Sequence, residues 1–316
     1  MLRRIMPEPL VIRQALVSTS LMLLRAIAAA WLVLAAGGGA NAASGTGSQW
    51  LERFAGPGPY KVEVKREALC CDRKGKAADL YLPVSRDGME FPVVTWGNGT
   101  WASPEKYDFL LRHLASWGMA VVATRDASVA RGETMRDALA LLTRDGPVAP
   151  LDLNRVAAIG HSQGAGGAVN AAIGDKGGIR TVIAIDLPAK GLCSAGDCDD
   201  IPSGLPPKTS ILFLSGAKDP LSRPDKIASY YDAVPAGLTK AKASVRDADH
   251  NDIQGQPACG FLAIGCRKGV DGFLPFITAW LAWQLDIEPR ARQVFAGKDA
   301  PFLDDNRLTA TGFSGG

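Results

Sequence analysis

The sequence contains few of the residues from which metal and redox centres are built. It has three histidines, far apart at positions 113, 161 and 250, and no C-x-x-C pair. A structural zinc site is therefore not expected, and no metal ion or cofactor is predicted. The glycine motifs of phosphoryl transfer and hydride chemistry are also missing, which argues against both classes of reaction.

The N-terminal region lacks an apolar run long enough to span a bilayer. Eleven apolar residues, 26–36, follow Arg25 and precede a stretch of small residues that ends at residues 40–42 (ANA). Spanning requires about 20 residues. A basic residue, an apolar core and an A-x-A site are typical of a cleaved export signal. Residues 1–42 are therefore predicted to be a signal peptide, with a membrane anchor as the alternative and Met22 as a candidate start. The mature protein is expected to be secreted or periplasmic, without stable membrane insertion.

The chain also lacks an excess of charge of one sign. Its formal net charge is +3. Removal of residues 1–42 leaves 31 of the 35 basic residues and 31 of the 32 acidic residues. A neutral mature chain has no basic surplus, so no nucleic-acid partner is expected.

The six cysteines are interpreted as disulfide partners, because the chain is expected to be exported. No cysteine precedes Cys70, which excludes lipid attachment near the cleavage site. Two pairs are close in sequence, Cys193 with Cys198 and Cys259 with Cys266. The remaining two, Cys70 and Cys71, would form a rare vicinal bridge unless one of them pairs elsewhere.

A length of 316 residues with 47% hydrophobic residues suits one large α/β domain. Short apolar runs alternate with segments of helical spacing, which predicts a mostly parallel sheet with helices on both faces. The expected strands are 60–66, at an edge, 77–82, 91–96, 118–124, 154–160, 179–186, 210–215 and 242–246. The expected helices are 104–117, 133–143, 164–173, 224–234 and 270–285. The domain is predicted to span residues 60–298, after a linker at 43–59 and before a flexible tail at 299–316.

The segment 160–164 (GHSQG) lies between an apolar run and a run of small residues. This pattern predicts a strand, a sharp turn and a helix, with Ser162 at the apex in a strained backbone conformation. Gly160 and Gly164 are expected because strand and helix approach closely there. The turn would present the hydroxyl of Ser162 outward as a nucleophile.

A serine nucleophile needs a base, and the histidines can be compared by position. His161 adjoins the serine but would point away from it and pack behind the turn. His113 lies on a helical stripe with leucines. His250 lies in a polar loop just after the last predicted strand of the sheet and is the predicted base.

The carboxylate that orients the histidine is predicted to be Asp219, after the strand 210–215. The chain order Ser162, Asp219, His250 is the order of the α/β-hydrolase triad. Four other aspartates are weaker candidates: Asp225, Asp186, Asp249 and Asp252. The first lies at a helix start, the second one strand earlier, and the last two are sequence neighbours of the histidine.

An oxyanion formed at such a serine needs two fixed donors. The backbone N–H of Gln163, at the start of the helix, is predicted to be one. The other is expected from the glycine loop after the strand 91–96, with Asn98 preferred and Gly99 next. Trp96 and Trp101 flank this loop and are candidates for substrate binding, although core packing is an equally good interpretation.

Three segments carry a family resemblance: 93–99 (VVTWGNG), 111–122 (LRHLASWGMAVV) and 160–164 (GHSQG). From about residue 60 to 296 the chain resembles α/β-hydrolases, and within them secreted polyester hydrolases, cutinase-like esterases and dienelactone-hydrolase-related esterases. In that group the oxyanion donors map to Asn98 and Gln163. Trp96 departs from the usual histidine or proline, and Gln163 from a frequent methionine or phenylalanine.

The resemblance implies an exported serine esterase that needs no cofactor and acts on a small-molecule or polymeric ester. The segment 187–208 is too short for a large lid, so an open or lightly covered cleft is expected. Two alternatives remain open: a peptidase or acyltransferase with the same triad, and a non-catalytic binding protein on this scaffold.

Overall fold

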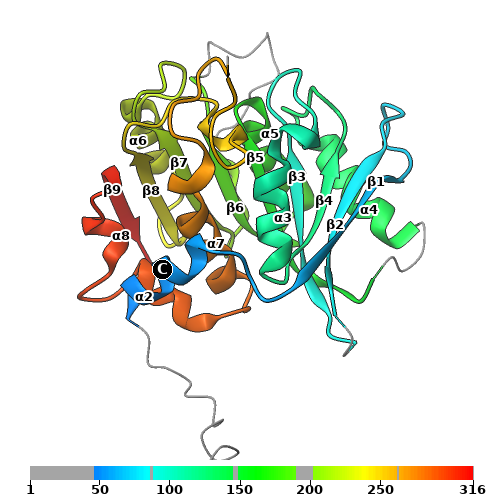
Figure 1. Cartoon of the computed structure of the whole chain (residues 1–316), viewed down its shortest axis with the longest axis horizontal. Coiled ribbons are helices and arrows are strands. Elements are labelled where there is room, and N and C mark those ends of the chain that lie inside the picture. The colour runs from blue at the N-terminus through cyan, green and yellow to red at the C-terminus, as the bar shows by residue number, and fades with distance from the viewer. Residues whose placement is uncertain (1–45, 86–87, 145–148, 190–201, 262, 316) are drawn as a thin grey trace, which may run out of the picture. The chain divides into compact units, whose positions relative to one another are not determined.

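The protein is described here from a computed structural model of residues 46–315, with the exception of 86–87, 145–148, 190–201 and 262. The predicted signal peptide, the Cys193–Cys198 pair and most of the short segment after Asp186 lie outside the described residues. The described part is an α/β structure with one nine-stranded sheet (Figure 1).

The sheet is parallel in its centre and antiparallel at both edges. Its strand order is β1-β2-β4-β3-β5-β6-β7-β8-β9, and the strands from β4 through β8 in that order pair in parallel. The strands are β1 (Lys61–Leu69), β2 (Ala78–Val84), β3 (Phe91–Gly97), β4 (Ala120–Thr124), β5 (Leu151–His161), β6 (Ile179–Ile185), β7 (Ser210–Gly216), β8 (Lys240–Val245) and β9 (Leu308–Ser314). Every strand expected from the sequence is present, and the expected edge strand is β1.

Helices cover both faces of the sheet, as the alternation of strands and helices predicted. One face packs against α2 (Gly47–Ala55), α3 (Asp108–Ser116) and α7 (Leu274–Gln284). The other face packs against α4 (Glu133–Arg144), α5 (Gln163–Asp175) and α6 (Pro224–Ala233). The central strands are buried on both sides, which explains their nearly continuous apolar sequences.

The prediction of a linker at 43–59 is wrong for its central residues, which form the helix α2. Thr46 and Gln49 make a reciprocal capping box at its start. Trp50, Leu51 and Phe54 lie on one side of the helix and are at most 5% exposed. Burial of these three side chains outweighs the breaking effect of the nearby glycines and prolines.

The prediction of a flexible tail at 299–316 is also wrong. This segment contains a short helix, α8 (Pro301–Asp304), and the strand β9. β9 pairs antiparallel with β8, with Leu308 opposite Val245 and Phe313 opposite Ala241. Most residues of β9 are small or polar, so the strand shows only a weak apolar pattern in the sequence. Backbone pairing with β8 is what orders it, and that pairing is not visible in the local sequence.

The predictions of disulfide bonds and of no stable membrane insertion both concern residues that the structure describes. Cys259 and Cys266 form a disulfide with an S–S distance of 2.04 Å, as predicted. The adjacent Cys70 and Cys71 are also paired with each other. Among the helices that the structure describes, none has both the length and the apolar character needed to cross a bilayer.

Candidate active site

Ser162 occupies a strained turn between β5 and α5, as the sequence predicted. Its φ of 57° and ψ of −124° fall outside the regions that L-residues favour. The helix α5 begins at the next residue, so the serine stands at the helix N-terminus. The two glycines of the motif are required by contact. A Cβ on Gly160 would lie 1.9 Å from the carbonyl oxygen of Gly164, and one on Gly164 would lie 2.2 Å from that of Gly97.

The three side chains selected from the sequence lie in one row. Ser162 Oγ is 3.0 Å from His250 Nε2, and His250 Nδ1 is 2.7 Å from Asp219 Oδ2. They come from three separate loops, which follow β5, β7 and β8. Because neighbouring parallel strands end at the same edge of the sheet, loops about 30 and 90 residues apart in sequence meet there.

The charge state of Asp219 fixes the tautomer of His250. Burial acts to raise the pKa of Asp219, but the hydrogen bond and charge of His250 outweigh it and hold the pKa below the usual value. Asp219 is therefore a carboxylate that accepts from Nδ1–H, and its other oxygen accepts from the backbone N–H of Leu221 at 2.7 Å. The lone pair of His250 Nε2 is consequently free to accept the proton of Ser162.

Asp186, the rival from the preceding strand, lies behind this row rather than in it. Its carboxyl group is fully buried. One of its oxygens, one oxygen of Asp219 and a ring nitrogen of His250 lie within 4.8 Å of one another. Burial and the nearby Asp219 raise the pKa of Asp186 well above its usual value. The raised pKa favours the protonated form of Asp186, so the negative charge of the pair is concentrated on Asp219, the residue that contacts His250.

The other rival aspartates are committed elsewhere. Asp225 pairs with Arg223 at 3.0 Å in the first turn of α6. Asp249 accepts from the backbone of His250 and pairs with Arg267. Asp252 accepts several backbone N–H groups of its own loop, including that of Arg267 at 3.1 Å. None of them contacts the imidazole of His250 among the described interactions.

His161 is buried behind the turn, as expected, but it also connects the surrounding loops. Its Nε2 lies 2.8 Å from the carbonyl oxygen of His250, and its Nδ1 lies 2.9 Å from the hydroxyl of Tyr107. That hydroxyl also accepts from the backbone N–H of Gly99 at 3.0 Å. Tyr107 was not predicted as part of the site. It lies in the short 3₁₀ helix Pro104–Tyr107, and no local pattern marks its contact with His161.

The two predicted oxyanion segments lie against each other. Gly164 touches the backbone of both Gly97 and Asn98, since a Cβ on it would lie 2.6 Å from the carbonyl oxygen of Asn98. The N–H of Gly99 is occupied by Tyr107, which favours Asn98 over Gly99 as the donor. Within the described part of the chain, the N–H groups of Asn98 and Gln163 donate to no other residue.

The two tryptophans differ in exposure. Trp96 has no exposed surface and packs in the core, with its Nε1 donating to Asn98 Oδ1 at 3.0 Å. It is therefore a core residue, and the prediction that it binds substrate is wrong. Trp101 is 92% exposed. Its backbone N–H donates to the carbonyl oxygen of Ala127, which also accepts from the side chain of Gln163, so Trp101 lies beside the residue that follows Ser162.

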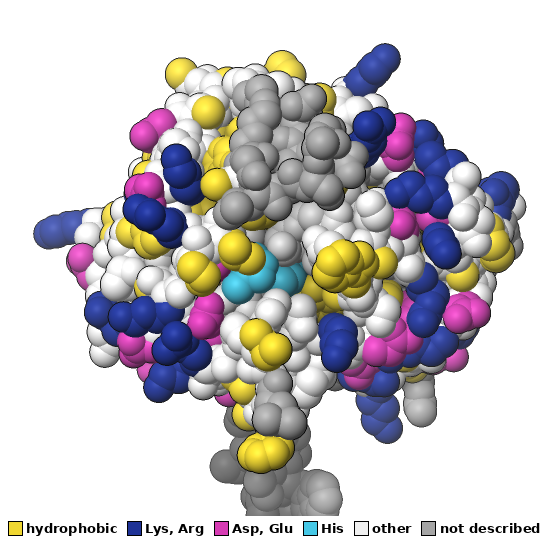
Figure 2. Space-filling view, turned by 90° about the horizontal axis from the view of Figure 1, so that it is seen from above, with side chains coloured by type: hydrophobic (Ala, Val, Ile, Leu, Met, Phe, Trp, Pro, Cys, Tyr) yellow, Lys and Arg dark blue, Asp and Glu magenta, His cyan; other side chains and the backbone are white. Residues whose placement is uncertain are grey.

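A cleft of about 860 Å³ lies beside the loop that follows His250. Asn251, the residue after His250, is one of its lining residues, together with Phe261 and Ile264 of the disulfide-closed loop; Ser162 itself is not. Phe261 and Ile264 are at least 90% exposed. Figure 2 shows histidine atoms reaching the surface on this side of the molecule, with hydrophobic side chains around them.

Two groups of potential metal ligands occur among the described residues, and both are engaged in other bonds. One is Asp186, Asp219 and His250, in which His250 Nδ1 and Asp219 already bond to each other. The other is Asp252 with Cys259 and Cys266, whose sulfurs form a disulfide and are not thiolate ligands.

Comparison with known proteins adds no further assignment, because neither a family model nor a curated protein matches the chain.

Proposed function

We propose that this protein is a serine esterase of the α/β-hydrolase type, with Ser162, His250 and Asp219 as its catalytic triad. The observation that carries the proposal is the continuous row from Ser162 Oγ through the imidazole of His250 to the carboxylate of Asp219, at 3.0 Å and 2.7 Å. The chain order of the three residues and the strained strand-to-helix turn also support it.

In the first half of the reaction, Ser162 Oγ attacks the ester carbonyl carbon while His250 Nε2 takes its proton. The carbonyl π electrons move to oxygen and form an oxyanion. The oxyanion accepts hydrogen bonds from the N–H groups of Asn98 and Gln163, aided by the positive end of the α5 dipole. The C–O bond to the alcohol then breaks, and the alcohol leaves with the proton from His250.

In the second half, water takes the place of the alcohol. His250 accepts a proton from water, the resulting oxygen attacks the acyl carbon, and the bond to Ser162 breaks with return of the proton to its Oγ. Asp219 stays ionised throughout and stabilises the imidazolium that forms twice per turnover.

The test is hydrolysis of p-nitrophenyl acetate by the wild-type protein and by Ser162→Ala. The variant is expected to lose measurable triad-dependent turnover while its thermal unfolding transition is unchanged. Among the described residues, the serine hydroxyl forms a hydrogen bond with His250 alone. Full activity in the variant would remove Ser162 from the mechanism. Cleavage of p-nitroanilides at a higher kcat/KM than esters would instead favour a peptidase.

A further inference from the structure

One loop contacts both residues whose amides are assigned to the oxyanion. This segment, called the 124–128 loop, begins at the last residue of β4 and carries Asp126. The side-chain amide of Asn98 donates to the carbonyl oxygen of Thr124 at 2.6 Å and to that of Asp126 at 3.1 Å. Asn98 is fully buried, so these bonds fix the orientation of its whole peptide unit.

The same loop holds the second donor residue. Gln163 donates from its side-chain Nε2 to the carbonyl oxygen of Ala127 at 2.6 Å. Its backbone N–H is the other donor assigned to the oxyanion. A displacement of the 124–128 loop would therefore move Asn98 and Gln163 together.

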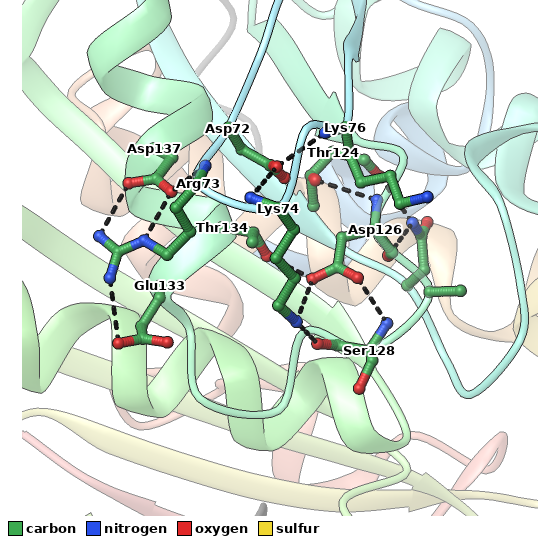
Figure 3. A network of polar contacts seen from close by, with 12 residues as sticks. Asp72, Arg73, Lys74, Lys76, Thr124, Asp126, Ser128, Glu133, Thr134 and Asp137 are labelled. Carbon is green, nitrogen blue, oxygen red and sulfur yellow. Dashed lines mark hydrogen bonds and ion pairs between the residues drawn. The ribbon is translucent and has the colours of Figure 1, made fainter.

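The carboxylate of Asp126 organises this loop, as Figure 3 shows. Its Oδ1 accepts from the backbone N–H of Ser128 at 3.0 Å, and its Oδ2 accepts from the hydroxyl of Thr134 at 2.9 Å. Oδ2 also pairs with Lys74 Nζ at 2.9 Å. Asp126 is only 4% exposed, and a carboxylate at that depth needs a cation and several donors.

Lys74 reaches the loop from the turn between β1 and β2. Besides Asp126, its Nζ donates to the carbonyl oxygen of Ser128 at 2.7 Å. It therefore holds the loop through a side chain and through the backbone. Its neighbour Arg73 points to α4 instead and pairs with Glu133 at 3.0 Å and with Asp137 at 2.8 Å (Figure 3).

We infer that Lys74 and Asp126 are positioning residues of the esterase: they hold the 124–128 loop so that the amides of Asn98 and Gln163 point to one oxygen. This inference rests on the proposed function. Neither residue contacts the Ser162–His250–Asp219 row among the described interactions, so both act through the loop.

The consequence for kinetics is specific. The negative charge on the substrate oxygen develops only in the transition state, so misplaced donors weaken the transition state more than the bound ester. Loss of positioning should therefore lower kcat and leave KM nearly unchanged. Misplacement by about 1 Å can cost on the order of 100-fold in rate, and partial loosening of one loop should cost on the order of 10-fold.

Arg73 offers a matched control for Lys74. The two residues are neighbours on the same turn, their side chains are 49% and 42% exposed, and both form ion pairs. Lys74→Met and Arg73→Met each remove one charge and keep an apolar stem. The partners of Arg73 are partly exposed, whereas Asp126 is buried, so Lys74→Met is expected to lose more stability than Arg73→Met. The kinetics are therefore compared at a temperature at which thermal unfolding shows both variants to be folded.

The experiment measures kcat and KM for p-nitrophenyl acetate, together with amide hydrogen exchange of the 96–103 peptide. Lys74→Met is expected to lower kcat about 10-fold with KM within about twofold, and to speed exchange of that peptide. Arg73→Met is expected to change neither. Lys74→Arg should restore most of kcat, because the guanidinium can still bridge Asp126 and Ser128. Asp126→Asn should resemble Lys74→Met.

Three results would overturn the inference: equal kcat for Lys74→Met and Arg73→Met, a rise in KM without a fall in kcat, or unchanged exchange of the 96–103 peptide. Each of these is compatible with Ser162-dependent turnover of the wild-type protein, so the proposed function would survive them. Absence of Ser162-dependent turnover in the wild-type protein would overturn both proposals.

Discussion

His161 Nε2 donates a hydrogen bond to the carbonyl oxygen of His250, over 2.8 Å. Burial, with a smaller effect of His250, lowers the pKa of His161 to about 3, so the ring is neutral and carries one proton. A carbonyl oxygen can only accept, which places that proton on Nε2. Nδ1 must then accept from the hydroxyl of Tyr107. The bond from Nε2 ties the loop that carries His250 to β5, the strand that ends just before Ser162.

Tyr107 is the first residue whose replacement tests this arrangement. Tyr107→Phe would leave His161 Nδ1 and the N–H of Gly99 without their partner in a buried site. An orphaned buried polar group costs about 1–3 kcal/mol, so we expect the free energy of unfolding to fall by about 2 kcal/mol or more in urea denaturation. Tyr60→Phe is the control, because Tyr60 donates only to Met89 Sδ at 3.4 Å near the surface. Equal stability of the two variants would contradict the buried hydrogen bonds assigned to the Tyr107 hydroxyl.

The buried Asp186 predicts a pH dependence of stability. Its raised pKa means that the folded chain keeps a proton that the unfolded chain releases above about pH 3.9. The contribution of Asp186 to the free energy of unfolding therefore falls as pH rises. The slope is about 1.4 kcal/mol per pH unit until the pH reaches the pKa of the folded state. Asp186→Asn removes this slope. The stability of the variant relative to the wild type should rise with pH above about pH 3.9 in urea titrations. Parallel curves would show that Asp186 is ionised in the fold.

Glycine at position 164 is required by the contact between α5 and the loop after β3. Gly164→Ala would press a methyl group against the backbone of Gly97 and Asn98, which cannot move without displacing the candidate oxyanion donors. We expect a loss of at least about 3 kcal/mol of stability, or no soluble protein, as judged by thermal unfolding. Gly174→Ala in the same helix is the control. The atoms nearest to its new methyl group belong to the guanidinium of Arg136, the end of a flexible side chain, and alanine favours the helix by up to about 1 kcal/mol. Comparable losses in both variants would argue against the close approach.

Trp101 predicts a dependence on the size of the acyl group. It is 92% exposed beside Gln163, so a long acyl chain can bury its ring, whereas an acetyl group cannot. Trp101→Ala should lower kcat/KM for p-nitrophenyl hexanoate about tenfold, which corresponds to roughly 55 Å² of lost apolar contact, and leave the acetate value unchanged. Leu303→Ala, at another exposed apolar residue, serves as control. Equal effects on both esters would remove Trp101 from substrate binding.

The strands and the three triad candidates could be predicted from sequence because each depends on a local pattern. Apolar runs indicated the strands, and the glycines around Ser162 indicated the turn. Parallel strands end at one edge of the sheet, so the loops with Asp219 and His250 were expected near it. The meeting of the loops after β5, β7 and β8 at that edge follows from the topology of the sheet.

Other features depend on contacts between distant segments and had no comparable local signal. β9 is ordered by pairing with β8, and Tyr107 gains its role only where it meets His161. The raised pKa of Asp186 follows from complete burial beside a second carboxylate. The helix α2 does have a local signal, the Thr46–Gln49 capping box, but it stands among glycines and prolines.

The central claim, that Ser162 is a nucleophile activated by His250, is tested most directly by covalent labelling. The intact protein would be treated with a fluorophosphonate, digested and mapped by mass spectrometry, with His250→Ala as the comparison. The account predicts one phosphonylated residue, Ser162, in the wild-type protein and labelling slower by at least about 100-fold in the variant. An unmodified Ser162 in folded wild-type protein, or equal labelling without the imidazole, would contradict it.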